Sequence, residues 1–284
     1  MKVIVRSIMP AVLLTAAVVS ASADLGPAGN YAILGFNGAN VTINLSSGPL
    51  MVNGNVGVGN NSTLNFSSGT VDGNVDLATS ATLNKSGGTT FINGNTNQPV
   101  DFSPINTAVN NEVSLLNSLA PTQTFSLGIQ NPTTITGNGG QNVISVGGNN
   151  GIHLSGGALT LSGGPSDTFV FQITSGNFAL SGDTNIVLSG GVTPNHVFWD
   201  IEGSGGQVQT SGNSNTAGIF LAPNEAIQIN GGTHNSEFIS GVNLSFQSNP
   251  VVNQVVPEPN SSLLFIGFGV ALLGIAKRKF LGAR

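Results

Sequence analysis

The chain of 284 residues has no cysteine and only seven lysines and arginines. Without cysteine there are no disulfides, so an exported fold must rest on its core and its hydrogen bonds. Between positions 24 and 256 Lys85 is the only basic residue, against 11 acidic ones, so the net charge of this stretch is 1 − 11 = −10. Binding of nucleic acid, or of phosphate and carboxylate groups, needs clustered Lys or Arg. The composition therefore argues against those ligands.

Long apolar runs occur only at the two ends. At the N-terminus, Lys2 and Arg6 precede an apolar stretch, and Ala21-Ser22-Ala23 provides a small-x-small cleavage site. This order is typical of a secretory signal peptide. We therefore predict an N-terminal signal helix within residues 1–23, with cleavage directed by Ala21 and Ala23, so that the mature chain starts at Asp24.

At the C-terminus, an apolar run of 14 residues extends from Leu263 to Ala276 and is followed by Lys277, Arg278 and Lys279. A helix of that length reaches ~21 Å, against a hydrocarbon core of ~30 Å. Two preceding serines and snorkelling lysines lengthen the span, so we predict a transmembrane helix over 261–276. The positive-inside rule places the basic cluster 277–279 in the cytoplasm and residues 24–256 outside.

Pro257, Glu258 and Pro259 directly precede this segment. The short motif, the apolar run and the basic cluster, in that order at the end of the chain, resemble the PEP-CTERM sorting signal of Gram-negative bacteria. The resemblance implies that residues 257–284 are a sorting tail, recognised and removed by an exosortase. It also implies transient anchoring in the inner membrane, followed by release to the cell surface or extracellular matrix.

The region between the two ends is repetitive. Val52-Asn53-Gly54-Asn55-Val56 recurs at Val71–Val75 and again, as Ile-Asn-Gly-Asn-Thr, at Ile92–Thr96. A motif that returns every ~20 residues indicates a solenoid, with short strands separated by Asn-Gly and Ser-Gly turns. Equivalent asparagines of stacked coils form amide ladders. We also expect Thr168–Ile173, Val197–Ile201 and Ile219–Leu221 to be buried strands, with Trp199 in the core.

One segment has a helical period. Ile105, Val109, Val113, Leu116 and Leu119 follow one another at spacings of three or four residues, and Pro121 ends the run. Ser103 is a suitable N-cap and Pro104 suits the first helical position. The pattern predicts an amphipathic helix over about 104–119 that packs along the side of the solenoid.

Two further stretches carry a resemblance over about residues 25–245. The opening Leu25–Leu34 with Val52–Val58, and the later Val197-Phe198-Trp199 with Gly218–Pro223, resemble the ice-binding-like domain. Leu221–Asn224 also resembles the choice-of-anchor A domain. The first resemblance implies a mainly β protein, a right-handed parallel β-solenoid (β-helix) with one helix packed alongside.

Three groups of residues are candidates for chemistry. Asp200 and Glu202 are two apart on a predicted strand and would project from one face. Paired carboxylates can serve glycoside hydrolysis, although an exposed strand face beside a turn is the simpler interpretation. Asp72 and Asp76 share parity within a repeat, but the calcium-loop patterns are missing. His153, His196 and His234 are far apart in sequence and match no zinc motif. We therefore expect no cofactor, no metal and no catalytic residue.

A flat face with ranked hydroxyls would suit ice binding. Thr134-Ile135-Thr136 is the clearest Thr-x-Thr and stands almost alone. The leading hypothesis is thus an exported, non-enzymatic solenoid of the cell surface or of a polysaccharide matrix. The alternatives are an ice-binding protein that uses a flat solenoid face, and a polysaccharide-active enzyme that uses Asp200 and Glu202.

Overall fold

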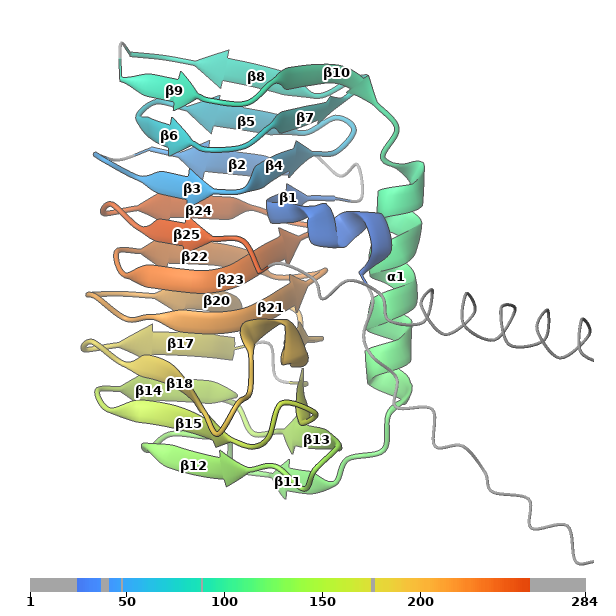
Figure 1. Ribbon diagram of the computed structural model, residues 1–284, viewed down its shortest axis with the longest axis vertical. Helices are drawn as coiled ribbons and strands as arrows, with labels where there is room; N and C mark the ends of the chain where they lie inside the picture. The colour runs from blue at the N-terminus through green and yellow to red at the C-terminus, as the bar shows by residue number, and fades with distance from the viewer. Residues whose placement is uncertain (1–24, 37–40, 47, 88, 175–176, 256–284) are drawn as a thin grey trace, which may run out of the picture.

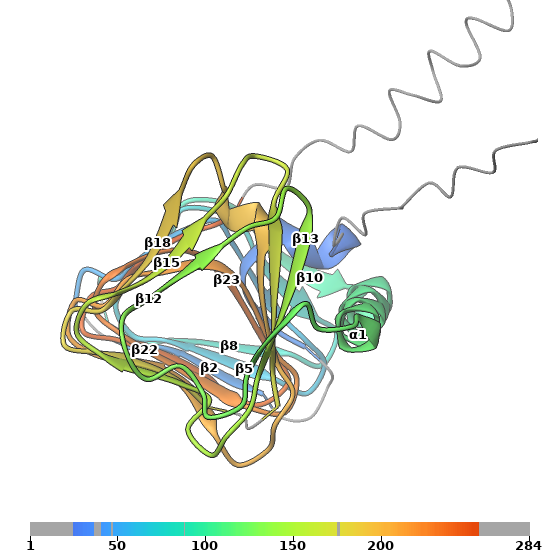
Figure 2. The same cartoon turned by 90° about the horizontal axis from the view of Figure 1, so that it is seen from below.

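The computed structural model describes residues 25–36, 41–46, 48–87, 89–174 and 177–255. They form a β-solenoid in which every paired strand runs parallel to its neighbours. Viewed along its axis, the solenoid has three faces, and helix α1 (Ser103–Ser118) lies outside one of them (Figure 2). The predicted mainly β fold, with one helix packed alongside, is confirmed.

The three faces are built as follows. The helix face holds ten strands: β10 (Thr96–Val100), β7 (Val75–Ala78), β4 (Asn55–Val58), β1 (Tyr31–Gly35), β23 (Thr233–Ser240), β21 (Thr216–Ala222), β19 (Val197–Ile201), β16 (Thr168–Ile173), β13 (Gln141–Val146) and β11 (Gln123–Phe125). The eight-stranded face holds β8 (Thr82–Lys85), β5 (Thr63–Phe66), β2 (Thr42–Leu45), β24 (Leu244–Gln247), β22 (Ala226–Asn230), β20 (Gln207–Thr210), β17 (Asn177–Ser181) and β14 (Ile152–Ser155). The third face holds β9 (Thr90–Ile92), β6 (Gly69–Val71), β3 (Met51–Asn53) and β25 (Val251–Asn253) above, with β18 (Asn185–Ser189), β15 (Ala158–Ser162) and β12 (Thr133–Thr136) below.

The chain does not run from one end of the solenoid to the other. It starts in the middle with the 3-10 helix η1 (Gly26–Asn30) and β1, and rises through β10. Helix α1 then leads down the side to β11, from which the chain climbs back to β25 (Figure 1). As a result β1 pairs with β23 as well as with β4, and β3 pairs with β25 as well as with β6.

The two ends of the described chain are joined at this seam. The side-chain amide of Gln254 donates from Nε2 to the carbonyl oxygen of Gly29 at 3.1 Å. Its Oε1 accepts a hydrogen bond from the backbone N–H of Asn55 at 3.2 Å. The two ends of the described chain are therefore held together within one hydrogen-bonded body that has its own core.

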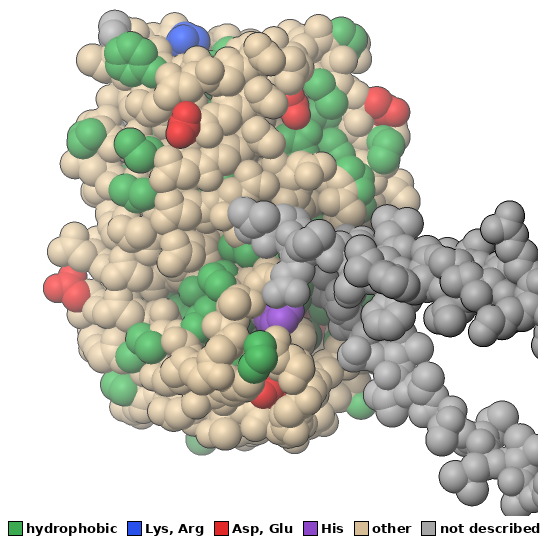
Figure 3. Space-filling view, in the orientation of Figure 1, with side chains coloured by type: hydrophobic (Ala, Val, Ile, Leu, Met, Phe, Trp, Pro, Cys, Tyr) green, Lys and Arg blue, Asp and Glu red, His purple; other side chains and the backbone are tan. Residues whose placement is uncertain are grey.

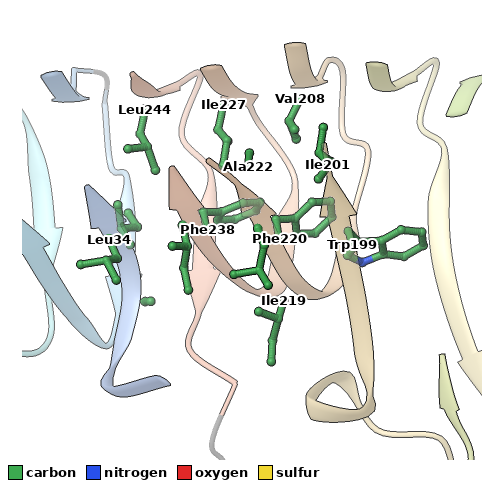
Figure 4. Close-up of a cluster of buried hydrophobic side chains, with 14 of the residues drawn as sticks. Leu34, Trp199, Ile201, Val208, Ile219, Phe220, Ala222, Ile227, Phe238 and Leu244 are labelled. Carbon is green, nitrogen blue, oxygen red and sulfur yellow. The ribbon is translucent and has the colours of Figure 1, made fainter. Parts of the chain in front are cut away.

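The core is a set of columns of inward side chains, because alternate residues of a strand point to opposite faces. On the helix face Phe171, Trp199, Phe220 and Phe238 occupy equivalent positions on successive strands. The Phe171 and Trp199 rings stack with centroids 4.2 Å apart, and the Trp199 and Phe220 rings follow at 5.6 Å. All four are fully buried, and Figure 4 shows Trp199, Phe220 and Phe238 of this column. The prediction that Trp199 and these strands are core is confirmed.

The Asn-Gly-Asn motifs form a corner that is stacked on itself. Asn74 N donates to the side-chain oxygen of Asn55 at 2.8 Å, and Asn95 N repeats the contact to Asn74 at 2.9 Å. A Cβ on Gly73 would lie 2.3 Å from the carbonyl oxygen of Gly54. Only glycine allows this approach, which explains why the motif keeps it at every coil. The predicted coil period of ~20 residues is confirmed in the upper half, whereas equivalent residues lower down are up to 30 apart.

Helix α1 lies close to its predicted bounds. Ile105, Val109 and Leu116 are buried, and Val113 and Leu119 pack against the core in part. The N-cap prediction was wrong: Ser103 is inside the first turn and Phe102 precedes the helix. The Ser103 N–H instead donates to Asp101 Oδ1 at 2.9 Å, and this bond holds the pKa of Asp101 below its ordinary value.

The predicted targeting segments lie outside the described residues. These are the signal helix with Ala21, Ala23 and Asp24, the sorting motif Pro257–Pro259, the transmembrane segment 261–276 and the basic cluster Lys277–Lys279. Within the part of the chain that the structure describes, no helix is long and apolar enough to cross a membrane.

Candidate functional site

The most regular surface of the protein lies on the upper half of the eight-stranded face. Strands β2, β5 and β8 pair in full register, so that Thr42, Thr63 and Thr82 form one column. Asn44, Asn65 and Asn84 form a second column in the same way. A serine follows each strand, and the backbone N–H groups of Ser67 and Ser86 bond to the preceding coil. We call these nine residues the Thr-Asn-Ser array: Thr42, Asn44, Ser46, Thr63, Asn65, Ser67, Thr82, Asn84 and Ser86.

Hydrogen bonds hold the central column of the array in place. Asn65 Nδ2 donates to Asn44 Oδ1 at 3.0 Å, and Asn84 Nδ2 donates to Asn65 Oδ1 at 3.0 Å. Every asparagine is thereby fixed in one rotamer before any ligand arrives. Adjacent parallel strands lie ~4.8 Å apart, and alternate residues on one strand ~6.6 Å apart. The array is thus a small two-dimensional lattice of ordered polar groups.

The array was missed in the sequence, where Thr134-Ile135-Thr136 stood out instead. The signal was the pattern Thr-x-Asn-x-Ser at positions 42, 63 and 82. Thr134 and Thr136 lie on β12, at the lower end of the third face, opposite Thr160 and Ser162 of β15. They are therefore not isolated, but this second group is smaller, and the exposed Val187 interrupts it on the next strand.

The lower half of the eight-stranded face has a different chemistry. Its outward positions hold long amides that bond to one another, such as Gln207 Nε2 to Gln228 Oε1 at 2.9 Å. His153 is exposed on β14 at the lower end. The eight strands contain no acidic residue, and Lys85 at the upper end is their only Lys or Arg. A face with so little charge suits an uncharged ligand.

Asp200 lies on β19 and Glu202 directly follows its last residue, Ile201, and both carboxylates face Asn117 of α1. The interpretation as an exposed strand face was wrong. Helix α1 packs over β19, Asp200 is fully buried and Glu202 is half-buried. With its amide nitrogen turned toward them, Asn117 of α1 donates to Glu202 Oε1 at 2.7 Å and to Asp200 Oδ2 at 2.5 Å. Burial above all, and then the charges of Glu202 and Glu112, raise the pKa of Asp200 to about 8.

Gln172, on the strand beside Asp200, completes this contact with the helix. Its Nε2 donates to the carbonyl oxygens of Leu116 and Leu119 at 2.8 and 2.9 Å, where the helix ends. The carboxylate pair is therefore part of the interface that holds α1, and no substrate reaches Asp200.

The remaining candidates have structural partners. Asp72 accepts a hydrogen bond from Asn93 Nδ2 at 3.3 Å, and Asp76 accepts from Tyr31 Oη at 3.0 Å and from Asn97 Nδ2 at 2.6 Å. Asp72 belongs to an amide ladder on the third face, where Asn53 Nδ2 also donates to Asn253 Oδ1. The side chains of Asp72 and Asp76 thus form links between coils.

The three histidines lie on different elements. His153 is on β14, His196 on the 3-10 helix η2 (Pro194–His196) and His234 on β23. His234 is buried between Thr216 Oγ1, at 2.9 Å from Nδ1, and the Gly231 carbonyl, at 2.7 Å from Nε2. Burial lowers the pKa of His234 to about 4, so its ring is neutral at pH 7. Among the described residues no three acidic, histidine or cysteine side chains are arranged to hold a metal ion.

Several solved structures of ice-binding proteins have a similar fold. An ice-binding protein of the Antarctic ascomycete Antarctomyces psychrotrophicus is 18% identical, over 82% of this chain and 98% of that one, with a TM-score of 0.54. A glycosylated ice-binding protein of an Arctic yeast is 18% identical, over 84% and 97%, with a TM-score of 0.58. An ice-binding protein of an Antarctic bacterium of the Flavobacteriaceae is 23% identical, over 83% and 48%, with a TM-score of 0.57.

At these identities the likeness shows a shared fold. A search of curated proteins by sequence finds no match. The family model of the ice-binding-like proteins, however, matches residues 38–251, which include the array and all three faces. Since this match spans most of the chain, the protein belongs to the ice-binding-like family.

Proposed function

We propose that the protein is an exported, non-enzymatic solenoid that binds ice through the Thr-Asn-Ser array. The observation that carries this proposal is the exact repetition of Thr, Asn and Ser on three strands paired in register. Membership of the ice-binding-like family supports the same ligand. Ice binding was the second hypothesis from the sequence, and the array is the reason for placing it first.

The array suits ice for a physical reason. Each hydroxyl or amide contributes little by itself, because a protein–water contact replaces a similar contact in liquid water. A net gain requires many groups that are already held in place, so that binding costs little side-chain entropy. The asparagine ladder provides this order, and the β ladder provides a repeat in two directions.

Export is the second part of the proposal. The signal peptide over 1–23 directs the chain across the inner membrane, and the tail 257–284 anchors it until an exosortase acts near Pro257–Pro259. The last described residue, Val255, lies two positions before Pro257. This destination would place the array outside the cell, where ice forms first.

The test is thermal hysteresis and ice recrystallisation of residues 24–256, with a bulky substitution in the array. Thr63→Tyr puts a large side chain in the middle of the threonine column of the array, and we expect it to abolish most of the activity. Thr160→Tyr is the matched control, since Thr160 is an outward threonine on a strand of the third face. An inactive wild-type domain would end the proposal. Equal losses in both variants would show that the array is not the binding surface.

A polysaccharide ligand is the second candidate, favoured by the sorting tail and by the uncharged amide-rich face. Binding of the same two variants to a panel of neutral polysaccharides distinguishes it from ice binding. The enzyme hypothesis is weakened by the burial of Asp200. An Asp200→Asn variant that lost sugar turnover found in the wild type would restore it.

A further inference from the structure

The upper end of the solenoid exposes strand edges. Strands β8, β9 and β10 each pair with a single neighbour, namely β5, β6 and β7. The described residues place no element beyond them (Figure 1). A free strand edge offers unpaired N–H and C=O groups to another chain, and native proteins block such edges by specific means.

Two of the three edges are poor templates for a further strand. Strand β9 is only three residues long. Strand β10 contains Pro99, which has no N–H, and its register shifts between Asn97 and Val100. In addition, Gln98 Nε2 turns back to the carbonyl oxygens of Ala78 and Ala81 at 3.1 and 3.0 Å. Proline, a register shift and short length each weaken edge pairing.

Strand β8 lacks these defects. All four of its residues pair in register with β5, from Thr82 opposite Thr63 to Lys85 opposite Phe66. It also carries the threonine and asparagine of the array, so it is a regular copy of the strands below it. By its backbone, β8 is the one edge at this end that a further strand fits.

The side chain of Lys85 distinguishes β8 from the strands below it. It stands at the inward position that the coils below give to Phe66, Leu45 and Phe246, all fully buried. Lys85 itself is exposed, because no coil covers it. It is also the only basic residue between positions 24 and 256. In the view of Figure 3, basic side chains occur only at this upper end of the molecule.

We propose that Lys85 prevents a second copy of this chain from adding to the solenoid at β8. An added coil would have to continue both the strand ladder and the inward column, which only another solenoid end can do. Burying the Lys85 ammonium inside such a column without a partner would carry a large desolvation penalty. The charge therefore keeps the end open to water and the exported protein monomeric, independently of whether the ligand is ice.

The experiment is sedimentation velocity of residues 24–256 over a wide range of protein concentration. Lys85→Met keeps the unbranched shape without the charge, and Lys85→Leu is a second apolar variant. We expect both to associate with rising concentration, so that the weight-average mass approaches at least twice that of the monomer. Circular dichroism checks that both are folded.

Two controls distinguish the effect of the inward column from nonspecific hydrophobic association. Thr82→Met adds the same side chain to the same strand but on its outward side, and Lys85→Glu keeps a charge in the column. Both should stay monomeric. Folded Lys85→Met and Lys85→Leu proteins that remain monomeric at every concentration would overturn the proposal, as would equal association of Thr82→Met.

Discussion

The buried carboxyl of Asp200 makes the stability of the domain depend on pH, and Asp200→Asn tests this directly. Asp200 is fully buried between the helix face and α1, beside Glu202 and Glu112. Its pKa is about 8 in the folded protein, against an ordinary value of 3.8. The folded state therefore holds a proton that the unfolded state releases at neutral pH.

The sign follows from this difference. The stability associated with protonated Asp200 is fully present below pH 3.8 and is lost progressively as the pH rises through about 8. Between pH 3.8 and about 8, each rise of one pH unit lowers the free energy of unfolding by about 1.4 kcal/mol. Between pH 5 and pH 7 the wild type should thus lose about 3 kcal/mol that Asp200→Asn does not lose. Burial also raises the pKa of Glu237 to about 9, so part of the wild-type slope remains in the variant.

Urea unfolding followed by tryptophan fluorescence measures the effect, since Trp199 is the only tryptophan and is buried among aromatic rings. Glu112→Gln removes a charge beside Asp200. It should also make the free energy of unfolding less dependent on pH than in the wild type, by a smaller amount than Asp200→Asn does. Asp101→Asn is the control: Asp101 is exposed with a lowered pKa, so this variant should run parallel to the wild type from pH 5 to pH 8. The reasoning fails if the curves of Asp200→Asn and the wild type are parallel over this range.

Three further predictions concern the scaffold. Trp199→Ala removes the centre of the aromatic column and should lower the free energy of unfolding by about 3–5 kcal/mol, whereas Trp199→Phe should cost much less in the same denaturation assay. Gly73→Ala puts a methyl group against the Gly54 carbonyl and should cost about 1–3 kcal/mol; an unchanged melting temperature would contradict the close stacking of the corner. Gln172→Ala removes the side-chain donor to the carbonyls of Leu116 and Leu119, of which Leu116 keeps the Leu119 N–H; this should cost about 1–3 kcal/mol, and hydrogen exchange should quicken in α1 more than in the strands.

Local features of the fold were predictable from the sequence because local rules control them. The stacked corner needs glycine at Gly54, Gly73 and Gly94, and that need appears directly as a repeated motif. The stripe of α1 was predictable because one face of the helix is buried. The N-cap was not predictable from Ser103. The backbone N–H of Ser103 donates to the side chain of Asp101, two residues earlier, and Ser103 itself lies inside the first turn.

The candidate site was harder to predict, since its parts become significant only in register. Thr42 and Thr63 are ordinary strand residues when considered one at a time. Similarly, the spacing of Asp200 and Glu202 is that of an exposed strand face, and only the docking of α1 buries Asp200 fully and Glu202 in part.

The repeat, the helix and the alternation of inward and outward residues are readable from the sequence alone, because each depends on neighbours within about 20 positions. The targeting segments are also visible there and stay predictions. The pairing of β1 with β23, the alignment of threonines and asparagines on three strands and the place of Lys85 at the end of a core column emerge only in the folded chain. These features depend on which coils are stacked on each other. That stacking follows from strand pairing and core packing between residues up to 225 positions apart, as between Gly29 and Gln254.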